Sequence, residues 1–335
     1  MKTTGIAGLL LAGMLLTGCN TQLISQQMVL SSAAVDVSQS PWQAKLEITL
    51  EEENEYITVE GNNFYELWKN AGRLYGSPVY LGALECVLLE GVADRDTMLK
   101  LLQELQSDPQ IGTNTQIALT DDARVLYDGE NIDGDAITAL LTHQYSRSND
   151  YSLKELTGLL LAEGRGALIP WIATEQDKAV IAGFTPSDSE DYTLRWEGNE
   201  VLYLVTGRKD VSHLSLPQKS GNAEIDLTNP SVKLSGFTDA EGPVVKLRIT
   251  ATVLSILSEG KNISAAVVEE AVKQELLSQL EEIQHEVAEA GNTDLFGIGK
   301  RIQLRNYGYF SHQKKDSAVY RVELRLRDPS GILSK

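Results

Sequence analysis

The sequence predicts an α+β fold of several domains, in which helices pack on mixed or antiparallel sheets. Residues 245–253 and 320–326 alternate apolar with polar side chains, which is typical of strands buried on one face. Between them, Val268, Val272, Leu276, Leu280, Ile283 and Val287 recur every three or four positions. This spacing predicts an amphipathic helix of about seven turns between Ser264 and Gly291. We expect the helix to lie across one face of an antiparallel sheet, because both elements then bury their apolar side.

The first half of the chain predicts further strands and helices. They are strands at 44–50 and 56–60, a helix around 98–105, a strand at 115–119, and helices at 135–145 and 152–162. The helix around 98–105 comes after residues 94–96, where Asp94 and Asp96 are typical of a helix start. Asp108-Pro109 is expected to end it. The last of these helices opens with Ser152 and Glu155 at the spacing of a capping box.

The composition and pattern of the sequence change between residues 167 and 243. Short apolar runs alternate there with Gly, Pro, Asn and Asp, and predict strands at 179–184 and 201–206 with a turn at 197–199. We therefore expect four segments. They are a signal peptide (1–18), an N-terminal domain (19–166), a small β-rich middle module (167–243) and a C-terminal α+β domain (244–335).

The composition is that of a globular protein with an acidic surface. The 335 residues are 42% apolar and 23% charged, which excludes a wholly disordered or fibrous chain. The formal net charge of −18 disfavours binding to nucleic acid, because such a surface repels phosphate backbones. Only Cys19 and Cys86 are cysteines, too few for a disulfide framework or a cysteine-rich zinc site.

The N-terminus predicts a lipid anchor. Lys2 precedes an apolar run over residues 5–17, which has the length of a signal-peptide core and is too short to span a bilayer. The run ends in Thr17-Gly18-Cys19, which is similar to the lipobox of bacterial lipoproteins. A diacylglyceryl group on the Cys19 thiol is the expected modification. The alternative is an ordinary secretory signal that contains a cysteine.

Cleavage before Cys19 would change the charge of the chain and the means by which it stays at a membrane. Lys2 is the only charged residue among 1–18, so its removal takes the net charge from −18 to −19. At this net charge the chain gains nothing from electrostatic attraction to anionic lipid. Acyl chains must therefore hold it, at about 0.8 kcal/mol per buried CH₂.

The sequence contains no familiar catalytic or metal-binding motif. His143, His213, His285 and His312 are scattered, and Glu281, Glu282 and His285 are expected on the solvated face of the long helix. Gly297, Gly299 and Lys300 lack phosphate-loop spacing and predict a turn, while Cys86 is expected to be a buried structural thiol. We predict no enzyme activity, no cofactor and no metal.

Several short motifs occur along the chain in the order that is typical of a known protein family. They are the lipobox, Ser32-Ala-Ala-Val-Asp36, the stretch from Gly76-Ser-Pro-Val-Tyr80 to Cys86-Val-Leu-Leu-Glu-Gly91, Ser107-Asp-Pro-Gln-Ile111, Ala179-Val-Ile-Ala-Gly-Phe184, and Asn292-Thr-Asp-Leu-Phe-Gly-Ile-Gly299. In this order they resemble the Ger(x)C family, the lipoprotein C subunits of spore germinant receptors. Asp294, Phe296, Gly297 and Gly299 are similar to the family signature D-x-F-G-x-G. We interpret them as a structural exit from the long helix, since glycines permit a close turn and Phe296 can fill the core.

The resemblance implies a non-catalytic subunit at the outer surface of the spore inner membrane. There it would assemble with the A and B membrane subunits and help trigger nutrient-induced germination. Two other classes remain open from the sequence. A lipid-anchored solute-binding protein would show repeated β-α-β units in two lobes around a ligand cleft. A lipid-anchored hydrolase of the cell envelope would need a cluster of reactive groups.

Overall fold

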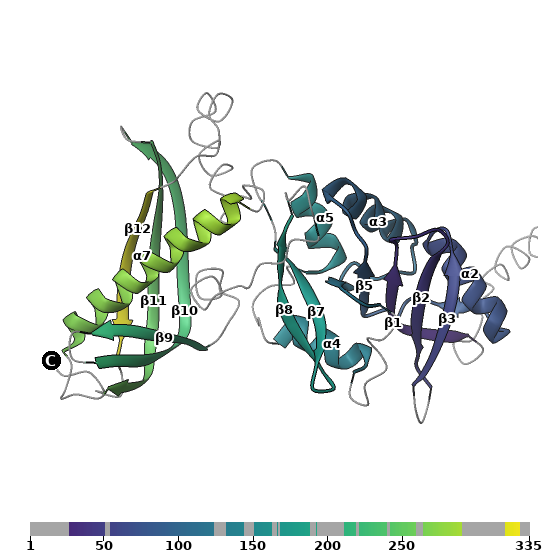
Figure 1. The fold of residues 1–335 in the computed structure, drawn as a ribbon, viewed down its shortest axis with the longest axis horizontal. Coiled ribbons are helices and arrows are strands. Elements are labelled where there is room, and N and C mark those ends of the chain that lie inside the picture. Colours follow the sequence, from purple (N-terminus) through teal and green to yellow (C-terminus); the bar gives the residue numbers. More distant parts are fainter. Residues whose placement is uncertain are drawn as a thin grey trace, which may run out of the picture.

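The computed structural model describes two β-sheets and the helices that cover them (Figure 1). The described residues are 27–50, 54–123, 132–143, 151–162, 166, 168–187, 192, 211–218, 221–239, 242–258, 264–289 and 319–328. Cys19, Asp294, Phe296, Gly297 and Gly299, together with the expected strand at 201–206 and turn at 197–199, lie outside them.

The first sheet is mixed and has eight strands. They are β1 (Met28–Asp36), β2 (Trp42–Ile48), β3 (Glu55–Gly61), β4 (Val79–Tyr80), β5 (Cys86–Glu90), β6 (Gln116–Thr120), β7 (Leu168–Glu175) and β8 (Lys178–Pro186). Seven of them lie in the order β3-β2-β1-β5-β6-β7-β8, and β4 pairs with β1. Strands β1, β5, β6 and β7 run parallel, while β2, β3 and β8 join them in antiparallel pairs.

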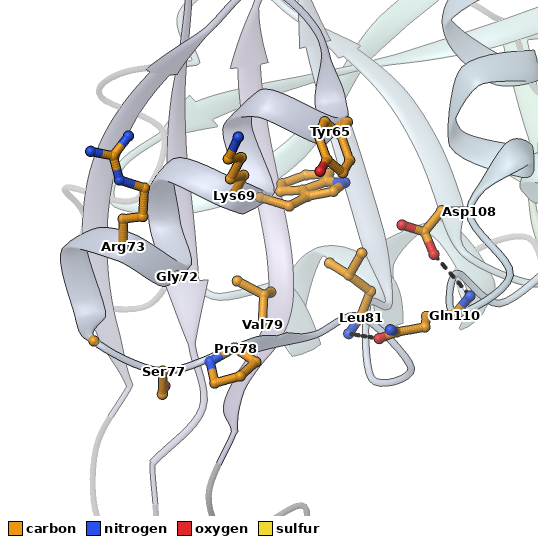
Figure 2. Close-up of a pocket in the computed structure, with 12 residues that line it drawn as sticks. Tyr65, Lys69, Gly72, Arg73, Ser77, Pro78, Val79, Leu81, Asp108 and Gln110 are labelled. Atoms are coloured by element: carbon orange, nitrogen blue, oxygen red, sulfur yellow. Dashed lines mark hydrogen bonds between the residues drawn. The ribbon is translucent and has the colours of Figure 1, made fainter. Parts of the chain in front are cut away.

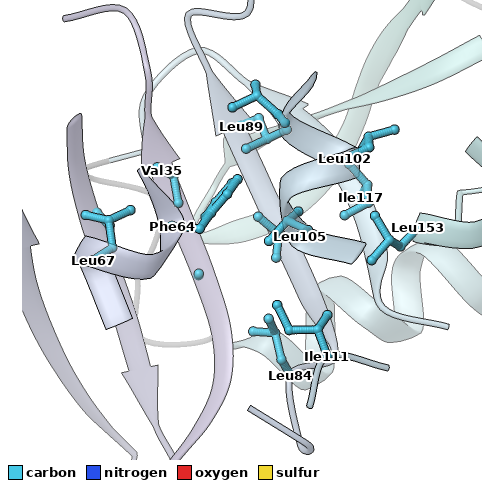
Figure 3. Packing of buried hydrophobic residues seen from close by; sticks show 14 of the residues in the cluster. Val35, Phe64, Leu67, Leu84, Leu89, Leu102, Leu105, Ile111, Ile117 and Leu153 are labelled. Carbon is cyan, nitrogen blue, oxygen red and sulfur yellow. The ribbon is translucent and has the colours of Figure 1, made fainter. Parts of the chain in front are cut away.

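Helices cover both faces of the first sheet. On one face, α2 (Phe64–Tyr75), α3 (Arg95–Ser107) and α5 (Leu153–Leu161) share a buried cluster with Val87 and Leu89 of β5. On the other face, α4 (Gly134–His143) shares a cluster with Cys86 and Leu88. Figure 3 shows side chains of α2 and α3 packed over the strands on the first of these faces. Because both faces are covered, residues 86–89 form a continuous apolar run rather than an alternating one.

The predicted helix starts of this half are confirmed. The Asp94 side chain accepts the Thr97 N–H at the start of α3, and the Ser152 hydroxyl accepts the Glu155 N–H at the start of α5. Helix α2 was not predicted, although Asn63 caps its start and Gly76 ends it with a φ of 80°. That left-handed conformation suits glycine, which has no Cβ to clash.

The second sheet has four strands, β9 (Val211–Gln218), β10 (Gly221–Asp239), β11 (Gly242–Ser258) and β12 (Val319–Arg327), in the order β12-β11-β10-β9. As predicted, one long helix, α7 (Ala265–Glu289), lies across one face of this sheet (Figure 1). Its residues Val268, Val272, Leu276, Leu280 and Ile283 are buried against the strands; the side chain of Val287 lies outside the description.

The expectation of an antiparallel second sheet holds only for β9, β10 and β11. Strand β12 runs parallel to β11, with Lys246 opposite Arg321 and Leu247 opposite Val322. The chain passes through α7 between these two strands, and such a crossover is what a parallel pair requires. The sheet is therefore mixed.

The strands that the structure describes within the predicted middle module, residues 167–243, are divided between the two sheets. Strands β7 and β8 extend the first sheet through the parallel pairing of β7 with β6. Strands β9 and β10 belong to the second sheet. Pairing with strands distant in sequence decides this division, so the local composition of residues 167–243 could not predict it. The domain boundaries themselves stay a prediction.

Candidate functional site: a groove beside helix α2

A groove of about 570 Å³ lies between α2, the segment leading into β4, and the loop after α3 (Figure 2). Figure 2 shows Tyr65, Lys69 and Arg73 along the helix side, and Pro78, Val79 and Leu81 along the facing segment. Trp68, Gly72, Gly76, Ser77, Asp108 and Gln110 complete the lining. The groove therefore joins three segments of the first half of the chain.

Aromatic side chains form much of the helix side of the groove. Trp68 is only 6% exposed, and its ring stacks on Phe64 with 5.7 Å between centroids. Phe64 in turn meets Trp42 edge to face at 5.5 Å. Tyr65 is 68% exposed and faces solvent. The groove thus combines one aromatic ring fixed by the core with one that is free to contact a ligand.

The charges of the groove are separated. Lys69 and Arg73 lie one helical turn apart on α2, and the Lys69 ammonium lies 5.9 Å from the Tyr65 ring centroid. Across the groove, the Asp108 carboxylate accepts the backbone N–H of Gln110 at 3.0 Å, and the side-chain Oε1 of Gln110 accepts the Leu81 N–H at 3.3 Å. This arrangement suits a segment with apolar and anionic groups.

The groove does not have the composition of a catalytic site. None of its twelve lining residues is a histidine or a cysteine, and Ser77 is its one aliphatic hydroxyl. A serine nucleophile needs a neighbouring base to activate it.

Sequence reasoning missed this groove because it missed α2. The signal that was available is the spacing of Tyr65, Lys69 and Arg73, each four residues apart between Asn63 and Gly76. Residues at this spacing lie on one face of a helix. The opposite wall, Pro78 to Leu81, could not have been assigned to the same site without the pairing of β4 with β1.

A second polar cluster surrounds the carboxylate of Glu47, which is 1% exposed. It accepts hydrogen bonds from Ser31 Oγ, Ser32 Oγ and the Gly134 N–H on Oε2, and from Asn54 Nδ2 and Tyr56 Oη on Oε1. A side chain at Gly134 would place its Cβ 2.5 Å from Oε2, so the close approach requires glycine. The carboxylate therefore joins the strands to the start of α4.

The surroundings of Glu47 raise the pKa values of two neighbouring side chains, Tyr56 and Glu85. Burial raises the pKa of Tyr56 above its ordinary value, and the Glu47 carboxylate adds to this. Burial also raises the pKa of Glu85, with further contributions from Asp135 and Glu47. Since protein donors satisfy both Glu47 oxygens, we interpret this cluster as structural.

The predicted Cys86 thiol is buried, and its Sγ lies 3.9 Å from the Gly134 carbonyl oxygen. On α7, Glu281, Glu282 and His285 are exposed, as expected of a solvated face. Among the described residues, no group of three or more His, Cys, Asp or Glu is placed to hold a metal ion. Within the same residues, no helix combines the length and apolar character needed to cross a membrane.

The fold defines the class of protein to which the chain is similar. It matches the crystal structure of the GerBC protein with a TM-score of 0.58, over 89% of this chain and 97% of that chain. The two sequences are 13% identical over this match, so the likeness shows a shared α+β fold.

A family match covers most of the first sheet and its helices. Residues 22–174 match the family model described as the spore germination protein N-terminal domain. This match supports the resemblance to the Ger(x)C family of spore germination proteins that the motifs predicted. A comparison with curated proteins found no match.

Proposed function

We propose that this chain is the lipid-anchored, non-catalytic C subunit of a spore germinant receptor. In this proposal Cys19 holds it at the outer surface of the spore inner membrane, where it assembles with the A and B membrane subunits. The match of residues 22–174 to a spore germination domain carries the proposal. The Thr17-Gly18-Cys19 motif supports the anchor.

The described geometry favours docking over chemistry. The groove beside α2 offers aromatic and charged side chains without a paired nucleophile and base. An anchored domain reaches a high local concentration near membrane partners, so weak contacts through such a surface can suffice. The solute-binding alternative required two lobes of repeated β-α-β units. In the described residues, the second sheet instead carries one helix on one face.

Deletion of the gene in a spore-forming host tests the function. We expect germination triggered by at least one nutrient to be lost or strongly slowed, with spore formation unchanged, and the intact gene to restore it. Germination kinetics are followed by the loss of optical density of a spore suspension. Unchanged kinetics with every nutrient, in a host without a second copy, would rule the proposal out.

A substitution at Cys19 tests the anchor. We expect Cys19→Ala to move the protein from the membrane fraction to the soluble fraction, because no thiol remains to carry acyl chains. The matched control is Cys86→Ala, which removes the other, buried cysteine and should leave the protein with the membrane. Recovery of all three proteins in the soluble fraction would favour an ordinary secretory signal, and Cys19→Ala staying with the membrane would contradict the anchor.

A further inference from the structure

The second sheet exposes a positively charged face in a chain that is strongly acidic. Its members are Lys233 of β10, Lys246 and Arg248 of β11, and Arg321, Arg325 and Arg327 of β12. We call these six residues the basic face. Lys233, Arg248, Arg321, Arg325 and Arg327 are exposed, and Lys246 is half-buried.

Strand register places all six residues on the side of the sheet away from α7. Lys233 pairs with Arg248, Lys246 with Arg321, Thr250 with Arg325, and Thr252 with Arg327. Neighbours of opposite parity on β11, such as Leu247 and Ile249, are fully buried in the cluster that contains α7. Side chains alternate between the faces of a strand, and paired residues share a face. Three adjacent strands therefore present their cations together.

One carboxylate lies within this set of cations. Glu323 forms an ion pair with Lys246 and accepts a hydrogen bond from Arg248 Nε at 3.0 Å. These two contacts lower the pKa of Glu323, so it remains ionised near neutral pH. The six cations and Glu323 together carry five net positive charges, whereas the whole chain carries −18.

The residues that lie between the cations differ from those at the centre of an ordinary protein–protein interface. Thr250, Thr252, Ser231 and Ser235 occupy positions between the cations along the strands. The centre of a protein–protein interface is usually apolar and depleted of charge. Hydroxyls and cations spread over a sheet instead match a layer of phosphate groups.

We propose that the basic face binds anionic lipid headgroups and lays the second sheet against the membrane surface. The inference rests on the proposed function in one respect, that the chain works at a membrane. A cation near an anionic bilayer contributes attraction within about one Debye length, roughly 10 Å at 0.1 M salt. The net charge of the chain gave no such attraction, but the local charge of one face does.

The charges elsewhere on the same sheet fix the orientation of the contact. Toward β9, Glu224 and Asp226 flank His213, whose Nδ1 lies 2.7 Å from Asp226 Oδ1. Hydrogen bonds from Ser255 and His213 lower the pKa of Asp226, so this end stays negative. An anionic surface attracts the β10–β12 part of the sheet and repels the β9 part.

Vesicle binding tests the inference without the anchor. The probe is the chain from residue 20 onward, which keeps every described element, mixed with vesicles of phosphatidylcholine alone or with half phosphatidylglycerol. We expect binding only to the anionic vesicles, weakening as salt rises. The triple variant K233Q/R325Q/R327Q should lower the affinity at least tenfold, since each cation near such a surface contributes measurably.

The matched control is K100Q/K154Q/K178Q, which removes three exposed lysines of the first sheet and its helices. It changes the net charge equally and should leave vesicle affinity within twofold of the parent. Circular dichroism checks that both variants keep the fold. Equal loss in both variants, or no binding to anionic vesicles, would overturn the inference. Equal or tighter binding to polyglutamate would also overturn it, in favour of an acidic protein partner. Failure here leaves the Cys19 anchor and the germination role to their own tests.

Discussion

The two sheets of this protein bury their side chains in different ways. The first sheet lies between helices on both faces, so four consecutive residues of β5, Cys86 to Leu89, are fully buried. The second sheet has α7 on one face, so Leu247 is buried while its neighbour Arg248 is exposed. The number of helical layers thus determines whether a strand reads as a continuous apolar run or as an alternating one.

The same difference determines how each sheet treats charge. The first sheet buries the Glu47 carboxylate and surrounds it with protein donors, which fixes the position of α4. The second sheet leaves its charged side chains in solvent, where they pair loosely across strands. Buried charge serves the fold in one region, and exposed charge is available for recognition in the other.

Truncation of core residues should show the largest effect and the clearest contrast. Leu88→Ala and Leu89→Ala face opposite sides of the first sheet, and each should lower the free energy of unfolding by about 2–5 kcal/mol. In β11, Leu247→Ala should cost a similar amount, while Arg248→Ser should change it by about 0.5 kcal/mol or less.

Denaturant unfolding measures these changes. Circular dichroism follows both sheets, and tryptophan fluorescence reports mainly on the first, because three of the four tryptophans belong to it: Trp42 and Trp171 lie in its strands and Trp68 in α2. If only one of the two β5 leucines mattered, the first sheet would be covered on a single face, and the comparison would fail.

Removal of the Glu47 carboxylate should have the next largest effect. Glu47→Ala leaves four buried or half-buried donors and the exposed Asn54 without their acceptor, and we expect a loss of about 2–3 kcal/mol. The matched control is Glu60→Ala on the exposed side of β3, which should change stability by about 0.5 kcal/mol or less. Similar unfolding midpoints for the two variants would show that the Glu47 network does not stabilise the first sheet.

Loss of a helix cap should have the smallest effect. Asn63 Oδ1 accepts the Glu66 N–H at 2.8 Å, so Asn63→Ala should cost about 1 kcal/mol, and Asn63→Asp should retain most of the stability. Hydrogen exchange should become faster in the first turn of α2 and stay unchanged in α7. Faster exchange in both helices would mean that the two regions are coupled.

Much of the fold could be predicted from local patterns. The alternation in 245–253 and 320–326 and the capping residues Asp94 and Ser152 all correspond to observed elements. Helix α2 was missed, and with it the groove, although Asn63 and Gly76 mark its ends. The division of strands β7 to β10 between the two sheets was also missed, because pairing between distant strands leaves no local trace.

The sequence by itself determined which residues alternate, where helices begin, and that the chain is acidic, because these depend on neighbours within a few positions. Only the tertiary structure decided that β12 lies parallel to β11 and that cations from three strands share one face. The reason is that the register of β11 and β12 joins residues 75 positions apart, as with Arg248 and Glu323. Net charge is a property of composition, but the local field at a surface depends on which side chains the fold brings together.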